Sequence, residues 1–327
     1  MLLDAVNAYA DVWRDQSVLQ LNINNEQVLA RQLEATQDRF DVGELTRTDV
    51  AQSESRLSSA TADRIGAEGN LTSSRAVFEN VVGVYPGILE QPPLPGGLPV
   101  SQEAIIDLAE SANPNVLATN YDELAAMRSV REVTGELLPR VQLQGSVGYQ
   151  HERNSRTSEG SSAEVLAVVT VPLYQQGSVS SRVREAKQVA SQRRLLVREA
   201  IRQAREDAIS GWESLLTARA QIAALEQSVR ANEIALEGVR QENAVGARTV
   251  LDVLDAEQEL LDAQVNLVSA QRDEIVATFQ VLTAIGRMTA EDLSLGTAVY
   301  DPEADYRAVR EKWFGLDAPG TEDDTGE

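Results

Sequence analysis

The chain contains two copies of one sequence pattern, and the copies lie 203 positions apart. The first copy occupies residues 39–50 and the second occupies residues 242–253. Val-Gly, a threonine and Asp-Val recur at equivalent positions in both, and Gly83 later matches Gly286 at the same offset. Because glycine accepts a left-handed backbone at no side-chain cost, each Val-Gly is predicted to form a tight turn. The repeated unit is therefore a long helix, a glycine turn and a second long helix.

Composition excludes several classes of protein. The formal net charge of −22 disfavours nucleic acid as a partner, because phosphate recognition requires a basic face. The chain has no cysteine and one histidine, which excludes disulfides, thiolate catalysis and cysteine or multi-histidine zinc sites. It also has no nucleophile–base set and no glycine-rich phosphate loop. We therefore predict no enzymatic activity, no cofactor and no metal. The charge itself indicates either a solvated surface or a negative lumen that favours cations.

Glycine and proline divide the chain into four parts. We expect a first-repeat helical hairpin in 1–84, a Pro/Gly connector with a short helix in 85–113, a second repeat in 114–287, and a C-terminal segment with an acidic disordered tail in 288–327. The second repeat is expected to contain a helix at 114–136, a β-hairpin at 139–177, a long helix at 178–243, a tip at 244–248 and a return helix at 249–287.

Two stretches inside the second repeat alternate between apolar and polar residues. In the first, Val141, Leu143 and Val147 alternate with polar residues, and in the second, within 164–174, valines and alanines share one face. This alternation is typical of strands with one apolar face. Both strands are about ten residues long, which is enough to cross a bilayer as tilted barrel strands. An ordinary hairpin of a soluble protein would alternate in the same way, so both interpretations stay open.

The predicted long helices carry apolar residues at heptad spacing. Two columns follow the first long helix of the second repeat: Ala190, Val197, Ala204, Gly211, Ala218 and Leu225, and Ile201, Ala208, Leu215, Ile222, Val229 and Leu236. The return helix has an alanine column: Ala256, Ala263, Ala270, Ala277 and Ala284. Alanine at every seventh position allows a neighbouring backbone to approach closely. A plain helical hairpin or a fibrous coiled coil would explain these columns equally well.

Three groups of residues together carry a resemblance to a known family. They are the two tip motifs, Leu138-Pro139 before the first strand, and Val171-Pro172-Leu173-Tyr174 with Gly177 after the second. In this order and spacing, the chain resembles the TolC-like outer-membrane efflux and type I secretion channels over nearly its whole length. The resemblance implies a mainly α fold with a small β part. Long antiparallel helical hairpins in two tandem repeats would form an α-barrel, and a transmembrane β-hairpin would contribute to a trimeric β-barrel.

The resemblance also implies a function and partners. The protein would be a passive exit duct of the Gram-negative outer membrane that extends into the periplasm, with 85–113 and 288–327 at its equator. It would be a homotrimer in outer-membrane lipid, working with a periplasmic adaptor (membrane fusion protein) and an inner-membrane transporter. The cargo would be drugs or secreted proteins. A soluble coiled-coil scaffold that only binds partners is the alternative.

The family's site residues fall on three sets of positions in this sequence. The constriction carboxylates, which favour cations, match Asp252 and Asp255. The polar links that hold the tip closed match Arg248, Asp49, Thr48 and Asn243, where asparagine replaces the family's usual tyrosine. The tips at which the adaptor docks match Val42, Gly43, Glu44, Val245, Gly246 and Ala247.

The repeat offset also bears on the first copy. It pairs Met1 with Ala204, which lies well inside the long helix of the second copy. The first copy would then lack the beginning of its helix and a β-hairpin, and the chain begins without an apolar export signal. Three such chains would supply six strands, fewer than the minimum of about eight in a membrane barrel. We therefore expect this sequence to be an N-terminally truncated form.

Overall fold

A computed structural model of the protein describes residues 2–151, 159–297, 301–310 and 312. The chain forms two compact units, which are described separately. The first unit contains Met1–Leu98, Ala218–Thr283 and Arg287–Glu327, and the second contains Pro99–Thr217 and Ala284–Gly286. In the part of the chain that the structure describes, no helix has an apolar stretch long enough to cross a membrane.

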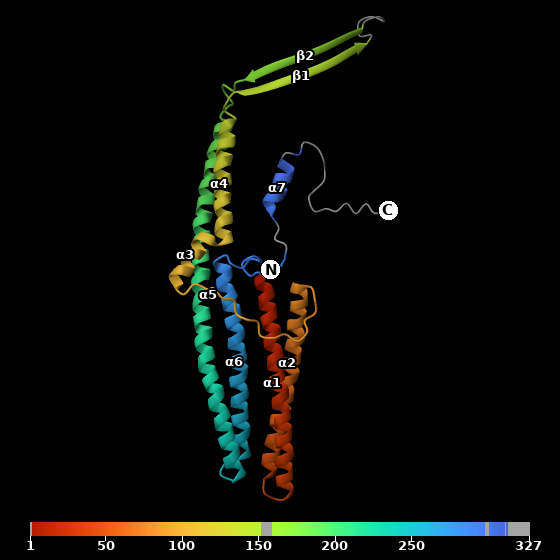
Figure 1. The fold of residues 1–327 in the computed structure, drawn as a ribbon, viewed down its shortest axis with the longest axis vertical. Coiled ribbons are helices and arrows are strands. Elements are labelled where there is room, and N and C mark those ends of the chain that lie inside the picture. The colour runs from red at the N-terminus through yellow and green to blue at the C-terminus, as the bar shows by residue number, and fades with distance from the viewer. Residues whose placement is uncertain (1, 152–158, 298–300, 311, 313–327) are drawn as a thin grey trace. The chain divides into compact units, whose positions relative to one another are not determined.

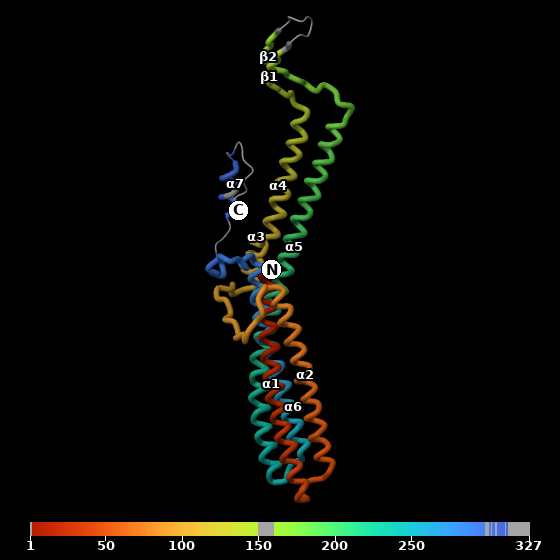
Figure 2. Tube along the Cα trace, turned by 90° about the vertical axis from the view of Figure 1, so that its right-hand side faces the viewer, coloured from red at the N-terminus to blue at the C-terminus, as the bar shows by residue number. Residues whose placement is uncertain are grey.

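The first unit is built from two long helical hairpins. One hairpin consists of α1 (Leu2–Asp41) and α2 (Arg47–Val82), which lie side by side in both views (Figures 1 and 2). The other consists of the C-terminal part of α5 (Ser178–Ala244) and α6 (Val250–Ala284). The return helix begins one residue later than predicted. It ends three residues earlier than predicted, because Gly286 adopts a left-handed backbone with φ 74°.

Small apolar clusters hold the two hairpins together along their length. One cluster joins α1 to α6 through Ala10, Trp13, Ile275 and Val276. Another, nearer the tips, joins α1, α2 and α6 through Leu29, Ala60, Val250 and Leu254. Several members of the predicted heptad columns are buried, at most 6% exposed: Ala204, Ala208, Leu215, Ala218, Leu236, Ala263, Ala270, Ala277 and Ala284. These apolar columns therefore form the seams between helices, as their spacing predicts.

The second unit contains α3 (Gln102–Ala112), α4 (Pro114–Gly135) and the N-terminal part of α5. Asn113 sits between α3 and α4, where its side-chain oxygen accepts from the amide of Asn115 at 2.9 Å and caps α4. Its side-chain nitrogen donates to the carbonyl of Ala284 at 3.0 Å. Ion pairs join α4 to α5, among them Arg182, which donates to both oxygens of Glu136 at 2.6 and 2.8 Å.

Two antiparallel strands, β1 (Arg140–His151) and β2 (Glu159–Thr170), form the sheet of the second unit (Figure 1). Residues opposite each other share a face of a sheet. One face is apolar, with Val141 opposite Val169, Leu143 opposite Ala167 and Val147 opposite Ala163. The other face is mixed, with Gln142 opposite Val168, Gln144 opposite Leu166 and Ser146 opposite Glu164. The apolar face is open to solvent in the chain, and Val147 is 90% exposed.

The hairpin ends earlier than the predicted segment of 139–177, whereas each strand, with 12 residues, is longer than the predicted ten or so. β2 ends at Thr170, two residues before Pro172, which has no amide hydrogen to continue the ladder. Residues 152–158 between the strands lie outside the described residues. Beyond α6 the structure adds α7 (Pro302–Arg310), which the sequence patterns did not predict. The predicted disordered tail at 317–327 lies outside the described residues.

Candidate functional site: the helical tips

The first tip, between α1 and α2, is a glycine-terminated helix end. Gly43 has a φ of 82°, which L-residues with side chains rarely adopt. Its amide donates to the carbonyl of Phe40 at 2.8 Å, and the amide of Glu44 donates to the carbonyl of Arg39 at 2.9 Å. These two bonds are those of a Schellman motif, which satisfies the last carbonyls of α1.

The second tip, between α5 and α6, has the same backbone geometry. Gly246 has a φ of 77°, and its amide donates to the carbonyl of Asn243 at 3.0 Å. The amide of Ala247 donates to the carbonyl of Glu242 at 2.9 Å. Two segments far apart in the sequence therefore make equivalent sharp turns, as the duplicated Val-Gly predicts.

Both returning helices begin with the same capping box. In α2, the amide of Thr46 donates to the carboxylate of Asp49 at 2.9 Å, and the amide of Asp49 donates to the hydroxyl of Thr46 at 3.3 Å. In α6, Thr249 and Asp252 make the same two bonds at 2.9 and 3.2 Å. These reciprocal bonds satisfy amides that would otherwise be unpaired at the beginning of each helix. Asp49 and Asp252 thus each stabilise the beginning of the helix in their own tip.

Each turn is also closed by an ion pair, but the order of charges is reversed between the tips. In the first tip, Arg39 before the turn contacts Glu44 after it at 3.2 Å. In the second, Glu242 before the turn contacts Arg248 after it at 2.9 Å. Arg248 lies 3.9 Å from Asp252 as well. Both turns are therefore held by backbone bonds and by one charged side-chain contact.

Among the residues that the structure describes, two side-chain contacts join the first hairpin to the second near the tips. Arg56 on α2 forms an ion pair with Asp255 on α6. Arg39 donates a hydrogen bond to the side-chain oxygen of Asn243 at 3.4 Å. The side-chain nitrogen of Asn243 donates to the carbonyl of Arg248 at 2.9 Å within its own tip. Asn243 therefore contacts both tips, through Arg39 in the first and Arg248 in the second.

The residues matched to the closed-state links are only partly brought together within the chain. Among the described residues, the ionic partners of Arg248 are Glu242 and Asp252, and neither Asp49 nor Thr48 is among them. Thr48 is exposed on the first turn of α2. The arginines that link the hairpins near the tips, Arg56 and Arg39, were not predicted to do so. No sequence pattern singles them out, because their partners are about 200 positions away.

The residues matched to adaptor docking share full access to solvent. Val42 and Val245, at the equivalent positions before the two glycines, are 73% and 80% exposed. The others are exposed as well: Gly43, Glu44, Gly246 and Ala247. Two exposed valines at the ends of polar hairpins are surfaces that a binding partner can cover.

Local contacts also shift the pKa values of Asp252 and Arg248 in the second tip. The hydroxyl of Thr249 donates to the carboxylate of Asp252 at 2.7 Å, and this bond, more than any other contact, lowers the pKa of Asp252 below 3.8. The Thr249 amide and the charge of Arg248 act in the same direction. The hydrogen bond with Glu242 raises the pKa of Arg248, which stays charged at all relevant pH.

We predict that acid loosens the beginning of α6 through Asp252. Because its pKa is lower in the folded than in the unfolded chain, its contribution to folding is present above pH 3.8 and is lost as pH falls through the folded pKa. Hydrogen exchange of the amides at 250–254 should therefore accelerate in this range, relative to intrinsic exchange rates. Thr249→Val, which removes the hydroxyl, should weaken that pH dependence. An identical pH profile in the variant would show that Asp252 is not tuned by Thr249.

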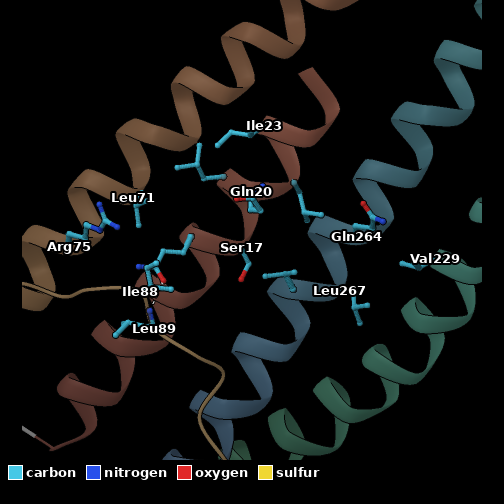
Figure 3. Close-up of a pocket in the computed structure, with 14 residues that line it drawn as sticks. Ser17, Gln20, Ile23, Leu71, Arg75, Ile88, Leu89, Val229, Gln264 and Leu267 are labelled. Carbon is cyan, nitrogen blue, oxygen red and sulfur yellow. Dashed lines mark hydrogen bonds between the residues drawn. The ribbon is translucent and has the colours of Figure 1, made fainter. Parts of the chain in front are cut away.

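The first unit also has a groove between its helices (Figure 3). It has a volume of 710 Å³ and is lined mainly by aliphatic and carboxamide side chains from α1, α2, α5, α6 and the connector. The side chain of Gln16 fixes the connector beside it, donating to Gly87 at 2.7 Å and accepting from Leu89 at 3.0 Å. Within the described ranges, no group of three or more His, Cys, Asp or Glu side chains is placed to hold a metal ion. The groove offers no convergent catalytic groups.

Comparison with known proteins supports the resemblance. The family model "Outer membrane efflux protein" matches residues 105–287. The chain is 37% identical over 319 residues to the outer membrane efflux protein BepC of Brucella suis, covering 97% of the chain and 70% of that protein. It is 29% identical over 304 residues to the outer membrane protein TolC of Vibrio cholerae, covering 90% of the chain and 69% of that protein.

Comparison with a solved structure supports the same fold. The outer membrane protein VceC of Vibrio cholerae matches with a TM-score of 0.74 and 22% identity, covering 87% of this chain and 69% of that one. The mainly helical, TolC-like fold expected from the sequence is confirmed at this level. BepC is named for outer-membrane efflux, and TolC and VceC are named as outer membrane proteins. The chain belongs to the outer membrane efflux protein family, and its location is the cell outer membrane.

Proposed function

We propose that the protein is the exit duct of a tripartite efflux pump or type I secretion system, through which drugs or secreted proteins leave passively. The observation that carries the proposal is the exposed apolar face of the β1–β2 sheet on the same chain as two matched helical hairpins. Such a face argues against a soluble coiled-coil scaffold, because exposed apolar surface promotes aggregation in water.

The sheet is suited to contact outer-membrane lipid. Each strand has 12 residues, so each is about 40 Å long at about 3.3 Å per residue. That length crosses the hydrocarbon core even when the strand is strongly tilted. The apolar face would contact lipid, and the face with Gln142, Gln144 and Ser146 would line an aqueous interior.

A homotrimer is supported by the surfaces that the single chain leaves uncovered. Among the described residues, β1 and β2 each pair only with the other. In hydrocarbon the outer edge of each strand must find another strand, because no water is present to satisfy its backbone groups. On α4, Leu117, Tyr121 and Leu124 follow helical spacing and are exposed. Neighbouring subunits would cover these residues and extend the sheet toward a closed barrel.

The tips would form the constriction and the docking site. Asp252 and Asp255, three residues apart on α6, would surround the axis as six carboxylates in a trimer. Arg248 would bond to Thr48 or Asp49 across a subunit boundary, in addition to its contact with Glu242. A periplasmic adaptor would cover the exposed Val-Gly turns, and an inner-membrane transporter would supply the energy for opening.

Replacing both Asp252 and Asp255 with asparagine tests the duct and its constriction together. Asparagine can still accept the capping bonds from Thr249, so the helix should remain folded while six charges are removed. The full-length protein should conduct in planar bilayers, and the variant should lose cation selectivity by on the order of fivefold or more at low salt. Glu291→Gln, an exposed acid beyond α6, serves as a control.

Two outcomes would contradict this proposal. Full-length wild-type protein that inserts into bilayers without conducting ions would contradict the duct itself. If wild type and variant have the same permeability ratio, the duct proposal stands, but the two aspartates do not form its constriction.

A further inference from the structure

The ion pair between Arg56 and Asp255 joins the two hairpins near their tips. The residues are 199 positions apart and lie on α2 and α6, so only the packing of these helices brings them together. Both side chains remain in contact with water, at 38% and 52% exposed. Exposed ion pairs contribute little to stability. The main effect of this contact is therefore on local charge.

Asp252 is in a different electrostatic environment from Asp255. Its carboxylate accepts bonds from the amide and the hydroxyl of Thr249, neither of which carries charge. Its neighbouring arginine, Arg248, lies 3.9 Å away and is bonded to Glu242 at 2.9 Å. Asp255 thus has a cation of its own, whereas Asp252 shares one with a second acid.

The sequence duplication shows that the Arg56–Asp255 pair occurs in one copy only. At the offset of 203 positions, Arg56 matches Glu259 and Asp255 matches Gln52. An equivalent contact with the hairpins exchanged would place Glu259 opposite Gln52, which cannot form an ion pair. The second repeat therefore has no arginine at the position equivalent to Arg56.

We propose that Arg56 is a selectivity-determining residue that neutralises Asp255. The inference rests on the proposed function, in which Asp252 and Asp255 line the constriction. A permeating ion responds to the sum of nearby charges, and a cation beside Asp255 cancels much of the attraction of that carboxylate. Asp252 then provides most of the cation selectivity, although both acids lie on the same stretch of α6.

Arg56→Gln tests this role in channels reconstituted from the full-length protein. The ratio of K⁺ to Cl⁻ permeability, taken from the reversal potential in a KCl gradient, should rise about threefold or more at low salt. Adding Asp255→Asn in the same chain should return the ratio toward the wild-type value. Arg64→Gln is the matched control, because it removes the same charge from α2. Arg64 pairs with Glu26 and Glu68 inside the first hairpin, so the ratio should not change.

The outcomes separate this inference from the function on which it rests. A conducting wild type with an unchanged ratio in Arg56→Gln would overturn the role of Arg56 and leave the duct in place. An equal rise in Arg64→Gln would also overturn it, because the effect would then be general to positive charge on α2. Absence of current from inserted full-length wild-type protein would overturn the duct itself, before any variant is compared.

Discussion

Gly286→Ala should destabilise the second unit by about 3 kcal/mol or more, because it combines backbone strain with a steric clash. Gly286 has a φ of 74°, and a Cβ added there would lie under 3.0 Å from the carbonyl oxygen of Ala112. It would also lie 3.1 Å from the carbonyl carbon of Ala112 and 3.2 Å from Cδ of Pro114. These neighbours are backbone and a proline ring at the α3–α4 junction, so they cannot move aside as a flexible side chain could.

Gly83→Ala is the matched control, since Gly83 is the equivalent glycine of the first repeat. Its φ of 85° imposes a similar strain, but no described atom lies within 4 Å of an added Cβ. The loss there should be only about 1 kcal/mol. Denaturant unfolding followed by circular dichroism compares the two variants. Equal losses at both glycines would show that the close approach to Ala112 has no energetic consequence.

Arg240→Ala should cost about 2–3 kcal/mol by leaving a buried charge without its partner. Glu257 on α6 is 5% exposed, and one carboxylate oxygen accepts from Arg240 on α5 at 2.9 Å. The other oxygen has no hydrogen-bond partner among the described residues. Removing the arginine therefore leaves an anion that neither water nor a cation compensates. We expect a lower unfolding midpoint and faster hydrogen exchange along the α5–α6 hairpin.

The double variant Arg240→Ala, Glu257→Gln identifies the cause of that loss. Glutamine keeps the shape of the side chain and removes its charge, so most of the stability should return. Arg219→Ala is a suitable comparison, because Arg219 pairs at 2.9 Å with Glu274 across the same two helices. Glu274 is 17% exposed, so the loss there should be smaller. A double variant no more stable than Arg240→Ala would assign the loss to packing of the arginine stem.

Local features of this fold follow directly from the sequence. Gly43 and Gly246 end helices because few other residues accept a positive φ, and Thr46 begins one because its hydroxyl and Asp49 satisfy the first amides. The heptad columns indicate the buried seams, since side chains seven positions apart lie on one face of a helix. In each case the controlling interaction is between residues close together in the chain.

Contacts between distant segments could not be predicted in the same way. From the sequence alone, Arg56 is an ordinary solvated helix residue, and only the packing of α2 beside α6 gives it a partner. Gly286 is likewise an ordinary helix end in the sequence, and only the structure places Ala112 against it. Glu257 was unremarkable in the sequence, because burial of a charged residue depends on which helices meet there. The candidate site was therefore located by its motifs, while its ionic partners came from the packing of helices.

The reversed ion pairs at the two turns limit how a docking protein can recognise them. A partner that recognises only the shape of the exposed valine and glycine would find two equivalent turns on the chain. A partner that also recognises charge would find base then acid at one turn, Arg39 and Glu44, and acid then base at the other, Glu242 and Arg248. Exchanging the charges of each pair would invert such a preference, while the backbone bonds of the two glycine turns would remain.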